Sequence, residues 1–353
     1  MRKNQLMLLP ALLLTVLLWP SDSRAEWQLP YDADTVLSVV SLSDEQASLA
    51  EYLYQPILRG ETKITLPDGT AYNDVSPAMR SLMQDYPELF HLGREYSVGY
   101  MQHEPDIALY ISPAYRMEVE QAQLIRQELY AIARDLAARH KTAEALHDAL
   151  LSRVTYGGTT ELCHTAVGAL LEGQATCEGY VHALTLLFRM AGVPCGMITG
   201  IAVDSSGTAQ NHSWNIASIG SYTLIDATWN DQDHVGLNTH WYYGLSTEQM
   251  AADHAMDEGQ QIPPCVAQAN WHAVRGWEIS TRSEAYAAVR HLVLTGEMLN
   301  LRIDDPALYE AVAGDTYAFL GDYNAAEPDE GFYGGYSVLK SDEQRCVIIL
   351  RTD

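Results

Sequence analysis

The chain has 353 residues, of which 47% are hydrophobic, and its formal net charge is −25 at pH 7. Such an acidic surface repels nucleic acids and anionic membranes, so neither is expected as a partner. The hydrophobic fraction is sufficient to bury one large core or two smaller ones.

The first 25 residues are typical of a signal peptide. Arg2 and Lys3 precede a mostly apolar run, residues 6–19, and Ser23-Arg24-Ala25 has small residues two positions apart. The run is too short to cross a bilayer comfortably, and no later stretch is apolar enough to be a membrane helix. We therefore predict cleavage after Ala25 and a secreted or periplasmic protein without a membrane anchor. The leader carries three basic residues and one acidic residue, so the remaining 328 residues have a net charge of −27.

Residues 26–116 are expected to form a small α+β unit. The stretch 56–66, "PILRGETKITL", closes a helical run with Gly-Glu and enters a strand. A short helix over 77–84 and a hairpin over 96–112 follow. A long helical stretch, 117–153, then joins this unit to the centre of the chain, and a break is expected near Lys141-Thr142.

A cysteine is predicted at the start of an apolar helix in "GQATCEGYVHALTLLFRMAGVPC", residues 173–195. Thr176 is able to cap this helix, apolar residues then recur at helical spacing, and Gly192 and Pro194 end it. Unpaired N–H groups and the helix dipole lower the pKa of a thiol at such a position, so Cys177 is a candidate nucleophile. A lone cysteine more commonly packs beside the cap, so a partner base is needed to decide.

The candidate base and its orienting acid lie in two strand-like runs, within "NHSWNIASIGSYTLIDATWN" at 211–230. The first run alternates apolar and polar residues, and the second extends from Tyr222 to Trp229. Ser218-Ile219-Gly220 suits a three-residue hairpin loop, and pairing of the residues that flank it puts His212 opposite Asp226. Opposed β-carbons lie about 5 Å apart, which lets a carboxylate hold an imidazole. A glycine bulge would shift this register by one position.

Cys177, His212 and Asp226 together match the roles of thiol nucleophile, general base and orienting acid. His182 is nearer to the cysteine, but five residues along a helix turn it about 140° away. A strand histidine and a strand-end acid, taken singly, are ordinary structural residues. Their combination with a helix-start cysteine favours a catalytic triad.

The same residues resemble the three motifs of the transglutaminase-like superfamily, whose fold is of the papain type. The motifs are "GQATCEGYVHALTLLFRMAGV", "NHSWNI" and "LIDATWND", and the resemblance extends to "HWYYGLSTEQMAADH". It covers residues 142–265 and implies a fold in which the nucleophile helix packs on an antiparallel sheet. With the small α/β units expected on both sides of this core, the predicted fold class is α+β. The resemblance also implies Cys177, His212 and Asp226 as the triad, a protein or peptide substrate and no cofactor. For Asp253-His254 we expect a structural role.

The sequence departs from this family in its oxyanion donors. Papain-type enzymes place a glutamine a few residues before the cysteine, and animal transglutaminases use an upstream tryptophan. Here Leu171 occupies the neighbourhood of that glutamine, and Gln174 is too near to Cys177 to match it. The backbone N–H of Cys177 can supply one donor, and Tyr156 or Gln174 is the candidate for the second.

Five cysteines follow the leader, and an odd number leaves at least one thiol free in an oxidising compartment. We expect Cys177 to be free and the other four to form up to two disulfides, with Cys163 and Cys195 as a pair that can meet across the helix. Cys163-His164 has no companion at a metal-ligand spacing, so no metal site is expected.

Residues 266–353 are expected to form a second small α+β unit. "LVLTGEMLNLR" at 292–302 closes a helix and enters a strand, and a short helix over 306–313 and a hairpin over 336–351 follow. This order repeats that of residues 26–116. Two explanations of this match are equally good. Either the chain contains two copies of one unit, which bracket a core (residues 117–265) and pack together, or the similarity arose by chance.

We therefore predict an exported cysteine acyltransferase or hydrolase that acts on protein or peptide amides through a Cys177 thioester. Transamidation, deamidation and proteolysis all stay open, as does the oligomeric state. Trp214 and Trp229 lie within the motifs and are candidates to wall the site, although aromatic strand residues commonly belong to a core. The alternative is a non-catalytic peptide-binding or scaffold protein that keeps the fold.

Overall fold

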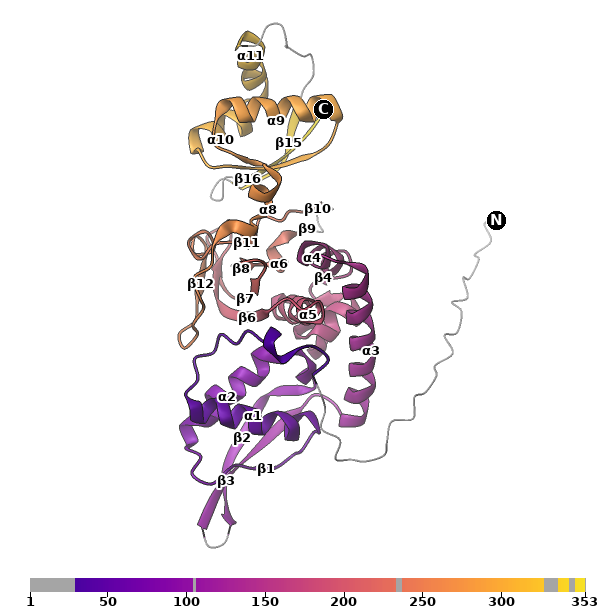
Figure 1. Cartoon of the computed structure of the whole chain (residues 1–353), viewed down its shortest axis with the longest axis vertical. Coiled ribbons are helices and arrows are strands. Elements are labelled where there is room, and N and C mark those ends of the chain that lie inside the picture. Colours follow the sequence, from indigo (N-terminus) through magenta and orange to yellow (C-terminus); the bar gives the residue numbers. More distant parts are fainter. Residues whose placement is uncertain (1–28, 104–105, 233–236, 327–335, 343–346, 353) are drawn as a thin grey trace, which may run out of the picture.

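The computed structural model describes residues 29–103, 106–232, 237–326, 336–342 and 347–352. The predicted signal peptide lies outside these residues. Three bodies follow one another along the long axis of the molecule: an N-terminal unit, a central core and a C-terminal unit (Figure 1). The expectation that the two terminal units pack together is wrong, because the core lies between them.

The N-terminal unit is a three-stranded antiparallel sheet of order β1-β3-β2 with two helices packed on it. Ser43 and Gln46 form a capping box that starts the first helix. Leu53 and Ile57 of that helix and Ile111 of the sheet are fully buried in the core of the unit. Its elements are α1 (Asp44–Leu58), β1 (Ile64–Thr65), α2 (Tyr72–Asp85), β2 (Leu92–His103) and β3 (Asp106–Tyr115).

The central core is an antiparallel sheet of order β11-β8-β7-β6-β12 with a layer of helices on one face (Figure 1). Its helices are α3 (Val119–Arg139), α4 (Ala143–Leu151), α5 (Cys177–Met190), α6 (Ala227–Asn230), α7 (Thr247–Met250) and α8 (Trp271–Arg275). The strands of the sheet are β6 (Cys195–Val203), β7 (Ala209–Ser218), β8 (Tyr222–Ile225), β11 (Tyr243–Leu245) and β12 (His254–Met256). Two short pairs lie beside it: β4 (Thr155–Tyr156) with β5 (Gln174–Ala175), and β9 (Asp231–Gln232) with β10 (Leu237–Asn238).

Helix α5 begins at Cys177 and ends before Gly192, as the sequence predicts. Its apolar side chains, among them Leu184 and Phe188, are fully buried. Thr176 is the N-cap residue, but its hydroxyl accepts no bond from the helix. The expected side-chain cap is therefore wrong, because that hydroxyl instead bonds to the backbone oxygen of Cys163 and lies 2.9 Å from Nδ1 of His164.

The hairpin β7–β8 has a different register from the predicted one. Ser218 pairs with Tyr222, and Gly220 lies at the centre of the three-residue loop between them, with φ of 76°. The predicted pairing of Ala217 with Ser221 is wrong by two positions, because the prediction has Gly220 at the end of the loop and the structure has it at the centre. A shift of two residues keeps every side chain on its face of the sheet, so the faces were predicted correctly.

The second strand of this hairpin is shorter than predicted. It ends at Ile225, and the next residues form the helical turn α6. Asp226 causes this change, because its Oδ1 accepts bonds from two backbone N–H groups at the start of α6. The other oxygen of this carboxylate, Oδ2, is bonded to His212, which lies on the neighbouring strand.

The C-terminal unit has a four-stranded sheet of order β13-β14-β16-β15 with helices on it. Its elements are β13 (Glu278–Ile279), α9 (Arg282–Thr295), β14 (Leu299–Ile303), α10 (Pro306–Ala313), α11 (Thr316–Ala326), β15 (Tyr336–Asp342) and β16 (Val347–Thr352). Apart from β13 and α11, both the order of elements and the order of strands are those of the N-terminal unit. The interpretation as two copies of one unit stays a prediction, with this agreement in its favour.

The two terminal units join the core through different contacts. Arg189 of α5 is fully buried and donates to the backbone oxygen of Asp85 in the N-terminal unit and to the hydroxyl of Tyr31. On the other side, Trp241 donates from Nε1 to Oδ1 of Asn300, 2.9 Å away. Both junctions contain a buried arginine, since Arg302 of the C-terminal unit also donates to the backbone oxygen of Trp241.

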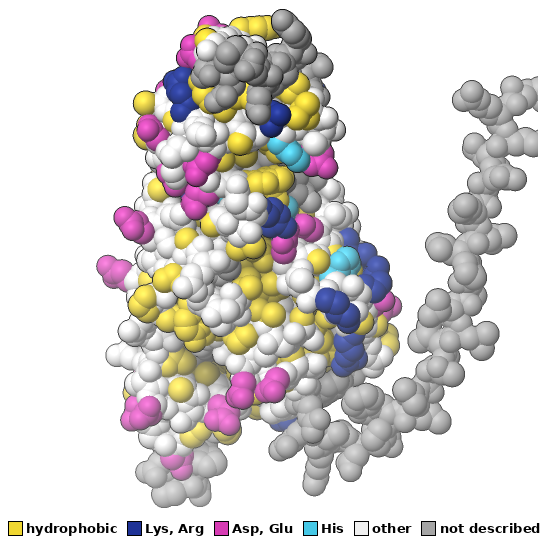
Figure 2. All heavy atoms as spheres, turned by 45° about the horizontal axis from the view of Figure 1, so that its top comes forward, with side chains coloured by type: hydrophobic (Ala, Val, Ile, Leu, Met, Phe, Trp, Pro, Cys, Tyr) yellow, Lys and Arg dark blue, Asp and Glu magenta, His cyan; other side chains and the backbone are white. Residues whose placement is uncertain are grey.

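Acidic side chains are scattered over the face shown in Figure 2; several basic ones lie along one edge, and others lie elsewhere on the face. The described part of the chain contains no helix with both the length and the apolar character that a bilayer crossing requires.

Candidate active site

Cys177 lies at the first position of α5 and is partly buried. The backbone N–H of a first helical residue has no acceptor within its helix. Gly179 allows the backbone at Cys163 to pack closely against the first turn of α5. A β-carbon at residue 179 would lie only 2.4 Å from the backbone oxygen of Cys163. The thiol and an N–H group that has no acceptor within its own helix therefore lie together at a tightly packed helix start.

His212 and Asp226 form a buried pair beside this thiol. Nε2 of His212 lies 2.7 Å from Oδ2 of Asp226, and the ring also interacts with Cys177. Burial lowers the pKa of His212, but the charge of Asp226 and the contact with Cys177 outweigh burial and raise that pKa to about 10. Burial raises the pKa of Asp226, but His212 and then His254 outweigh it and hold the pKa well below its usual range. The structure thus brings together the three residues that the sequence predicts as a triad.

His254 is a functional candidate for which the sequence indicated only a structural role. Its Nε2 lies 3.2 Å from the same Oδ2 of Asp226 that binds His212. Its Nδ1 lies 2.5 Å from Asp253, whose other carboxylate oxygen accepts from the hydroxyl of Tyr242 at 3.0 Å. A continuous series of polar contacts therefore runs from His212 through Asp226 and His254 to Tyr242. The motif "AADH" was the available signal, but only the pairing of β12 with β6 shows where it lies.

Two tryptophans enclose the imidazole of His212. Its ring centroid lies 6.4 Å from that of Trp214, with an interplanar angle of 22°, and 5.2 Å from that of Trp229. These aromatic contacts limit the rotation of the imidazole and exclude water from its faces. Trp214 is only 2% exposed and belongs to the core, and Trp229 packs against that core, so a wall of the site built by these residues stays a prediction.

Tyr156 is the better placed of the two candidates for a second oxyanion donor. Burial raises the pKa of its hydroxyl, and the nearby charges of Cys177 and Asp226 raise it further. The side chain is still 59% exposed, so its hydroxyl is accessible to a substrate. Gln174 is exposed on the neighbouring strand β5.

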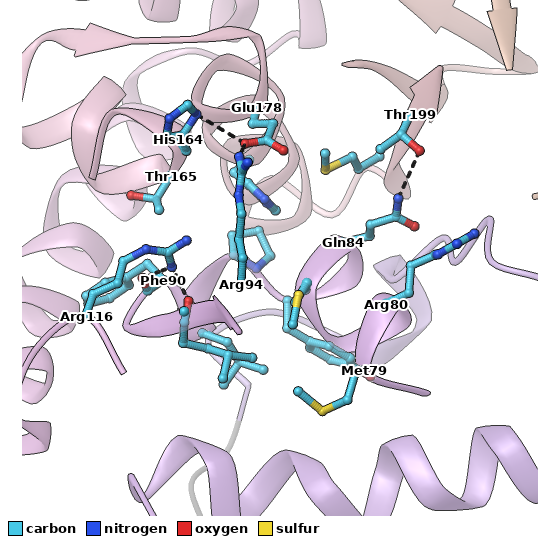
Figure 3. Close-up of a pocket in the computed structure, with 18 of the residues that line it drawn as sticks. Met79, Arg80, Gln84, Phe90, Arg94, Arg116, His164, Thr165, Glu178 and Thr199 are labelled. Carbon is cyan, nitrogen blue, oxygen red and sulfur yellow. Dashed lines mark hydrogen bonds and ion pairs between the residues drawn. The ribbon is translucent and has the colours of Figure 1, made fainter. Parts of the chain in front are cut away.

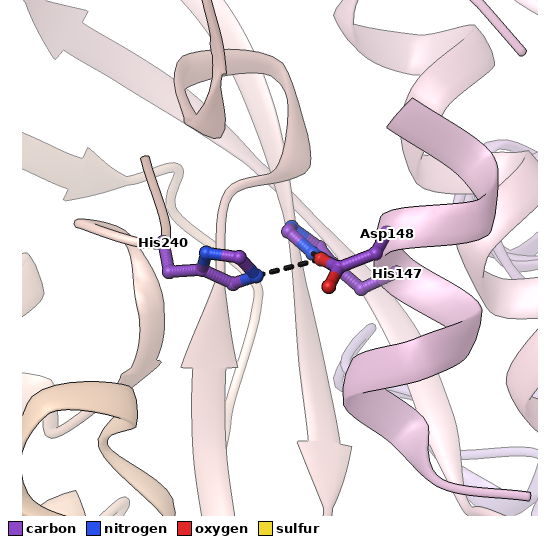
Figure 4. A group of neighbouring side chains, drawn as sticks. All are labelled: His147, Asp148 and His240. Atoms are coloured by element: carbon purple, nitrogen blue, oxygen red, sulfur yellow. Dashed lines mark hydrogen bonds and ion pairs between the residues drawn. The ribbon is translucent and has the colours of Figure 1, made fainter. Parts of the chain in front are cut away.

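A second cluster of two histidines and one aspartate lies at α4. Figure 4 shows His240 pointing toward Asp148, with His147 beside them. Asp148 Oδ1 lies 2.6 Å from Nε2 of His240 and 2.9 Å from Nδ1 of His147. Three such ligand atoms within 4.8 Å of one another are close enough to hold a metal ion.

The neighbouring Asn230 accounts for this cluster without an ion. Its Oδ1 accepts from the backbone N–H of Tyr242 at 2.8 Å, so its Nδ2 is the group that faces Nε2 of His147, 3.1 Å away. His147 must then accept at Nε2 and carry its proton on Nδ1, from which it donates to Asp148. A metal ion would need the lone pair of that Nδ1. Burial lowers the pKa of His147, which agrees with a neutral ring.

Cys163, Cys177, Cys195 and Cys265 are all free thiols. The expected bridge between Cys163 and Cys195 is therefore wrong; Cys195 is instead fully buried and lies 3.8 Å from the hydroxyl of Thr185. Burial raises the pKa of Cys195 to about 11, and it also raises that of Cys163. Cys346 lies outside the described residues.

Residues 130–229 match the family model Transglut_core, described as the transglutaminase-like superfamily. The similarity to that superfamily therefore lies in the central core, within residues 130–229. The predicted α+β fold, with the nucleophile helix packed on an antiparallel sheet, is confirmed. A comparison with curated proteins yields no match.

Three solved structures show weak similarity. The periplasmic domain of TgpA from Pseudomonas aeruginosa, bound to ethylmercury, is 17% identical; the match covers 36% of this chain and 58% of that one, with a TM-score of 0.24. A candidate cysteine protease from Cytophaga hutchinsonii is 13% identical over 39% of this chain and 66% of that chain, with a TM-score of 0.24. A TGase is 12% identical over 47% of this chain and 50% of that chain, with a TM-score of 0.27. TM-scores this low carry no argument about the whole chain.

Proposed function

We propose that this chain is an exported cysteine acyltransferase or hydrolase that acts on amides of proteins or peptides. The observation that carries the proposal is the position of Cys177 at the start of α5, beside His212, whose Nε2 is bonded to the buried Asp226. A thiol, an imidazole and a carboxylate in this order can form and resolve a thioester.

The first half of the reaction forms the thioester. The Cys177 thiolate attacks the carbonyl carbon of the amide, and the negative charge moves to the carbonyl oxygen. The backbone N–H of Cys177 and the hydroxyl of Tyr156 are the candidates to stabilise that oxygen. The C–N bond then breaks, His212 gives its proton to the leaving nitrogen, and ammonia or an amine departs.

The second half resolves the thioester. Neutral His212 takes a proton from water or from a primary amine as it attacks the thioester carbonyl. The C–S bond breaks, and Cys177 returns as a thiolate beside protonated His212. Water yields hydrolysis, which is deamidation or proteolysis, whereas an amine yields transamidation. Asp226 keeps the ring oriented throughout both halves.

Incubation of the mature protein with a glutamine peptide and a labelled primary amine tests the proposal. Label on the peptide establishes transamidation, a gain of about one mass unit without label establishes deamidation, and shorter peptides establish proteolysis. Cys177→Ala is the control and abolishes each of these products. A thioester trapped on Cys177 by rapid acid quench would identify the intermediate directly.

The absence of every product over a broad panel of peptides and envelope proteins, with Cys177 still open to alkylation, would contradict the proposal. A non-catalytic peptide-binding protein would then be the better account.

A further inference from the structure

A cavity of about 390 Å³ lies between the N-terminal unit and the start of α5 (Figure 3). One part of its wall is apolar and rich in methionine, a flexible side chain that adapts to different ligands. The apolar residues that line it include Met79, Met83, Leu89, Phe90 and Met197.

The charged part of the wall is cationic. Arg80, Arg94 and Arg116 line the cavity, and Glu178 is the one carboxylate among its lining residues. With neutral histidines, the arginines and this glutamate leave a net charge of +2 in a chain whose own net charge is −25. Burial, then the charges of Arg189, Arg116 and Arg94, lower the pKa of His182, which also lines the cavity, to about 4. Burial and the neighbouring arginines therefore both favour the neutral form of His182.

Two polar atoms at this cavity lack a hydrogen-bond partner among the described residues. They are Nε of Arg116 and Nδ1 of His182, and both are buried. The side chain of Arg116 is only 13% exposed, and Glu161, its nearest acid, is 83% exposed and lies 3.9 Å away. A buried donor without a partner is costly, so a bound anion that accepts from Arg116 would be stabilised.

The cavity lies beside the start of α5, where Cys177 is found, but Cys177 itself is not among its lining residues. Glu178 follows Cys177 directly and forms an ion pair with Arg94, as Figure 3 shows. His164, also in the wall, lies 2.9 Å from the hydroxyl of Thr176, the residue before Cys177. Residues on both sides of Cys177 in the sequence therefore belong to the cavity or contact its wall.

We infer that this cavity binds an acidic segment of the peptide substrate, with a carboxylate side chain at Arg94 and Arg116 and a neighbouring apolar side chain on Met79 and Met83. The inference rests on the proposed function, because only that function makes the bound peptide a substrate. The binding itself requires no chemistry at Cys177. Arginine suits a carboxylate because its planar guanidinium donates two parallel bonds. Glu178 holds Arg94 in the free protein and competes with the ligand for it.

Fluorescence anisotropy on the mature Cys177→Ala protein tests this inference, since that variant binds but cannot turn over. The probes are fluorescein-labelled Leu-Glu-Gln-Glu-Leu amide and two matched peptides with glutamine or lysine in place of the glutamates. We expect the glutamate peptide to bind about tenfold more tightly than the glutamine peptide, and the lysine peptide to bind most weakly. Equal affinities for the three peptides would overturn the inference.

Two substitutions with opposite expected effects on peptide affinity make the test more specific. Arg94→Gln should weaken binding of the glutamate peptide about tenfold and leave the glutamine peptide unchanged, whereas Glu178→Gln should strengthen binding of the glutamate peptide severalfold. Arg139→Gln is the matched control, because Arg139 has one ion pair and is 57% exposed, compared with 59% for Arg94. Arg94 is exposed enough for the variant to fold, which the melting temperature verifies.

An effect of Arg139→Gln as large as that of Arg94→Gln would contradict a specific cavity. Full competition by 1 mM inorganic phosphate would assign the cavity to simple anions and overturn the peptide assignment. Binding of the glutamate peptide without any product in the labelled-amine assay would separate this inference from the proposed function, which alone would then fail.

Discussion

The core contains two clusters of the same composition, each with two histidines and one aspartate, at different distances from Cys177. In the cluster at the active site, Asp226 binds His212 and His254, and all three side chains are buried. In the cluster at α4, Asp148 binds His147 and His240, and its side chain is 39% exposed.

The difference between His212 and His147 lies in the partner of the ring nitrogen that does not face the aspartate. For His212 it is the Cys177 thiol, which can exchange a proton with the ring. For His147 it is the amide of Asn230, which donates a bond and cannot accept a proton from the ring. The proposed function therefore uses the first cluster for acid–base chemistry, whereas the second cluster forms a structural network.

The second cluster contains a strained residue that supports its structural interpretation. His240 has φ of 53°, a conformation that is uncommon for a residue other than glycine. Its ring stacks on Trp271 at 4.6 Å with an interplanar angle of 6°, and Nε2 is bonded to Asp148. These contacts hold the strained backbone in place and join α4 to α8.

The largest expected difference between the clusters concerns the pKa of His212. NMR titration of the mature protein should show His212 protonated up to about pH 10, and Asp226→Asn should lower this midpoint by about three units because the neighbouring negative charge is lost. The matched change Asp148→Asn should leave the midpoint where it is.

The same pKa sets a pH dependence of stability. A pKa raised from 6.5 to about 10 stabilises the fold below pH 6.5, and this contribution disappears as the pH rises to 10. The difference in unfolding free energy between the wild type and His212→Gln should accordingly shrink over that range. A constant difference in urea unfolding at pH 6, 8 and 10 would refute the raised pKa.

Reactivity of the thiol is the next largest effect. Cys177 should react with iodoacetamide near pH 6 far faster than an ordinary cysteine, and His212→Ala should slow it about 100-fold. His147→Ala is the matched control and should not change the rate. Equal rates in the wild type and His212→Ala, followed by mass spectrometry of the peptide that contains Cys177, would exclude the triad.

Asp148→Asn should act on stability and not on the thiol. The amide cannot accept from both His147 and His240 as strongly as the carboxylate does, so we expect a loss of about 1 kcal/mol after allowance for solvent screening at this partly exposed site. Urea unfolding measures the loss. A change in the alkylation rate of Cys177 in the folded variant would show that the two clusters are coupled.

The smallest effect expected is that of Tyr156→Phe. Removal of one oxyanion donor that is half exposed should lower kcat about threefold and leave both KM and the alkylation rate of Cys177 unchanged. Gln174→Ala is the comparison, since the sequence offered it as the alternative donor. A larger loss in Gln174→Ala than in Tyr156→Phe would reverse the assignment.

Much of the site could be predicted because its signals are local. A helix start, a hairpin and a loop glycine place Cys177, His212 and Asp226 from nearby residues alone. The error of two positions in the hairpin left the prediction intact, since it preserved the face of every side chain. Asp226 itself ended the strand early by capping α6, an outcome that strand periodicity does not show.

By itself the sequence determined the helix that bears Cys177, the α+β class of the core and, apart from β13 and α11, the order of elements in both flanks, because periodicity, turn glycines and helix breakers act over a few residues. Only the tertiary structure decided the partners that lie far apart in the chain. His254 reaches Asp226 through the pairing of β12 with β6, and Arg94 reaches Glu178 through the packing of the N-terminal unit on α5. Such contacts depend on how whole elements pack, and no local pattern records that packing.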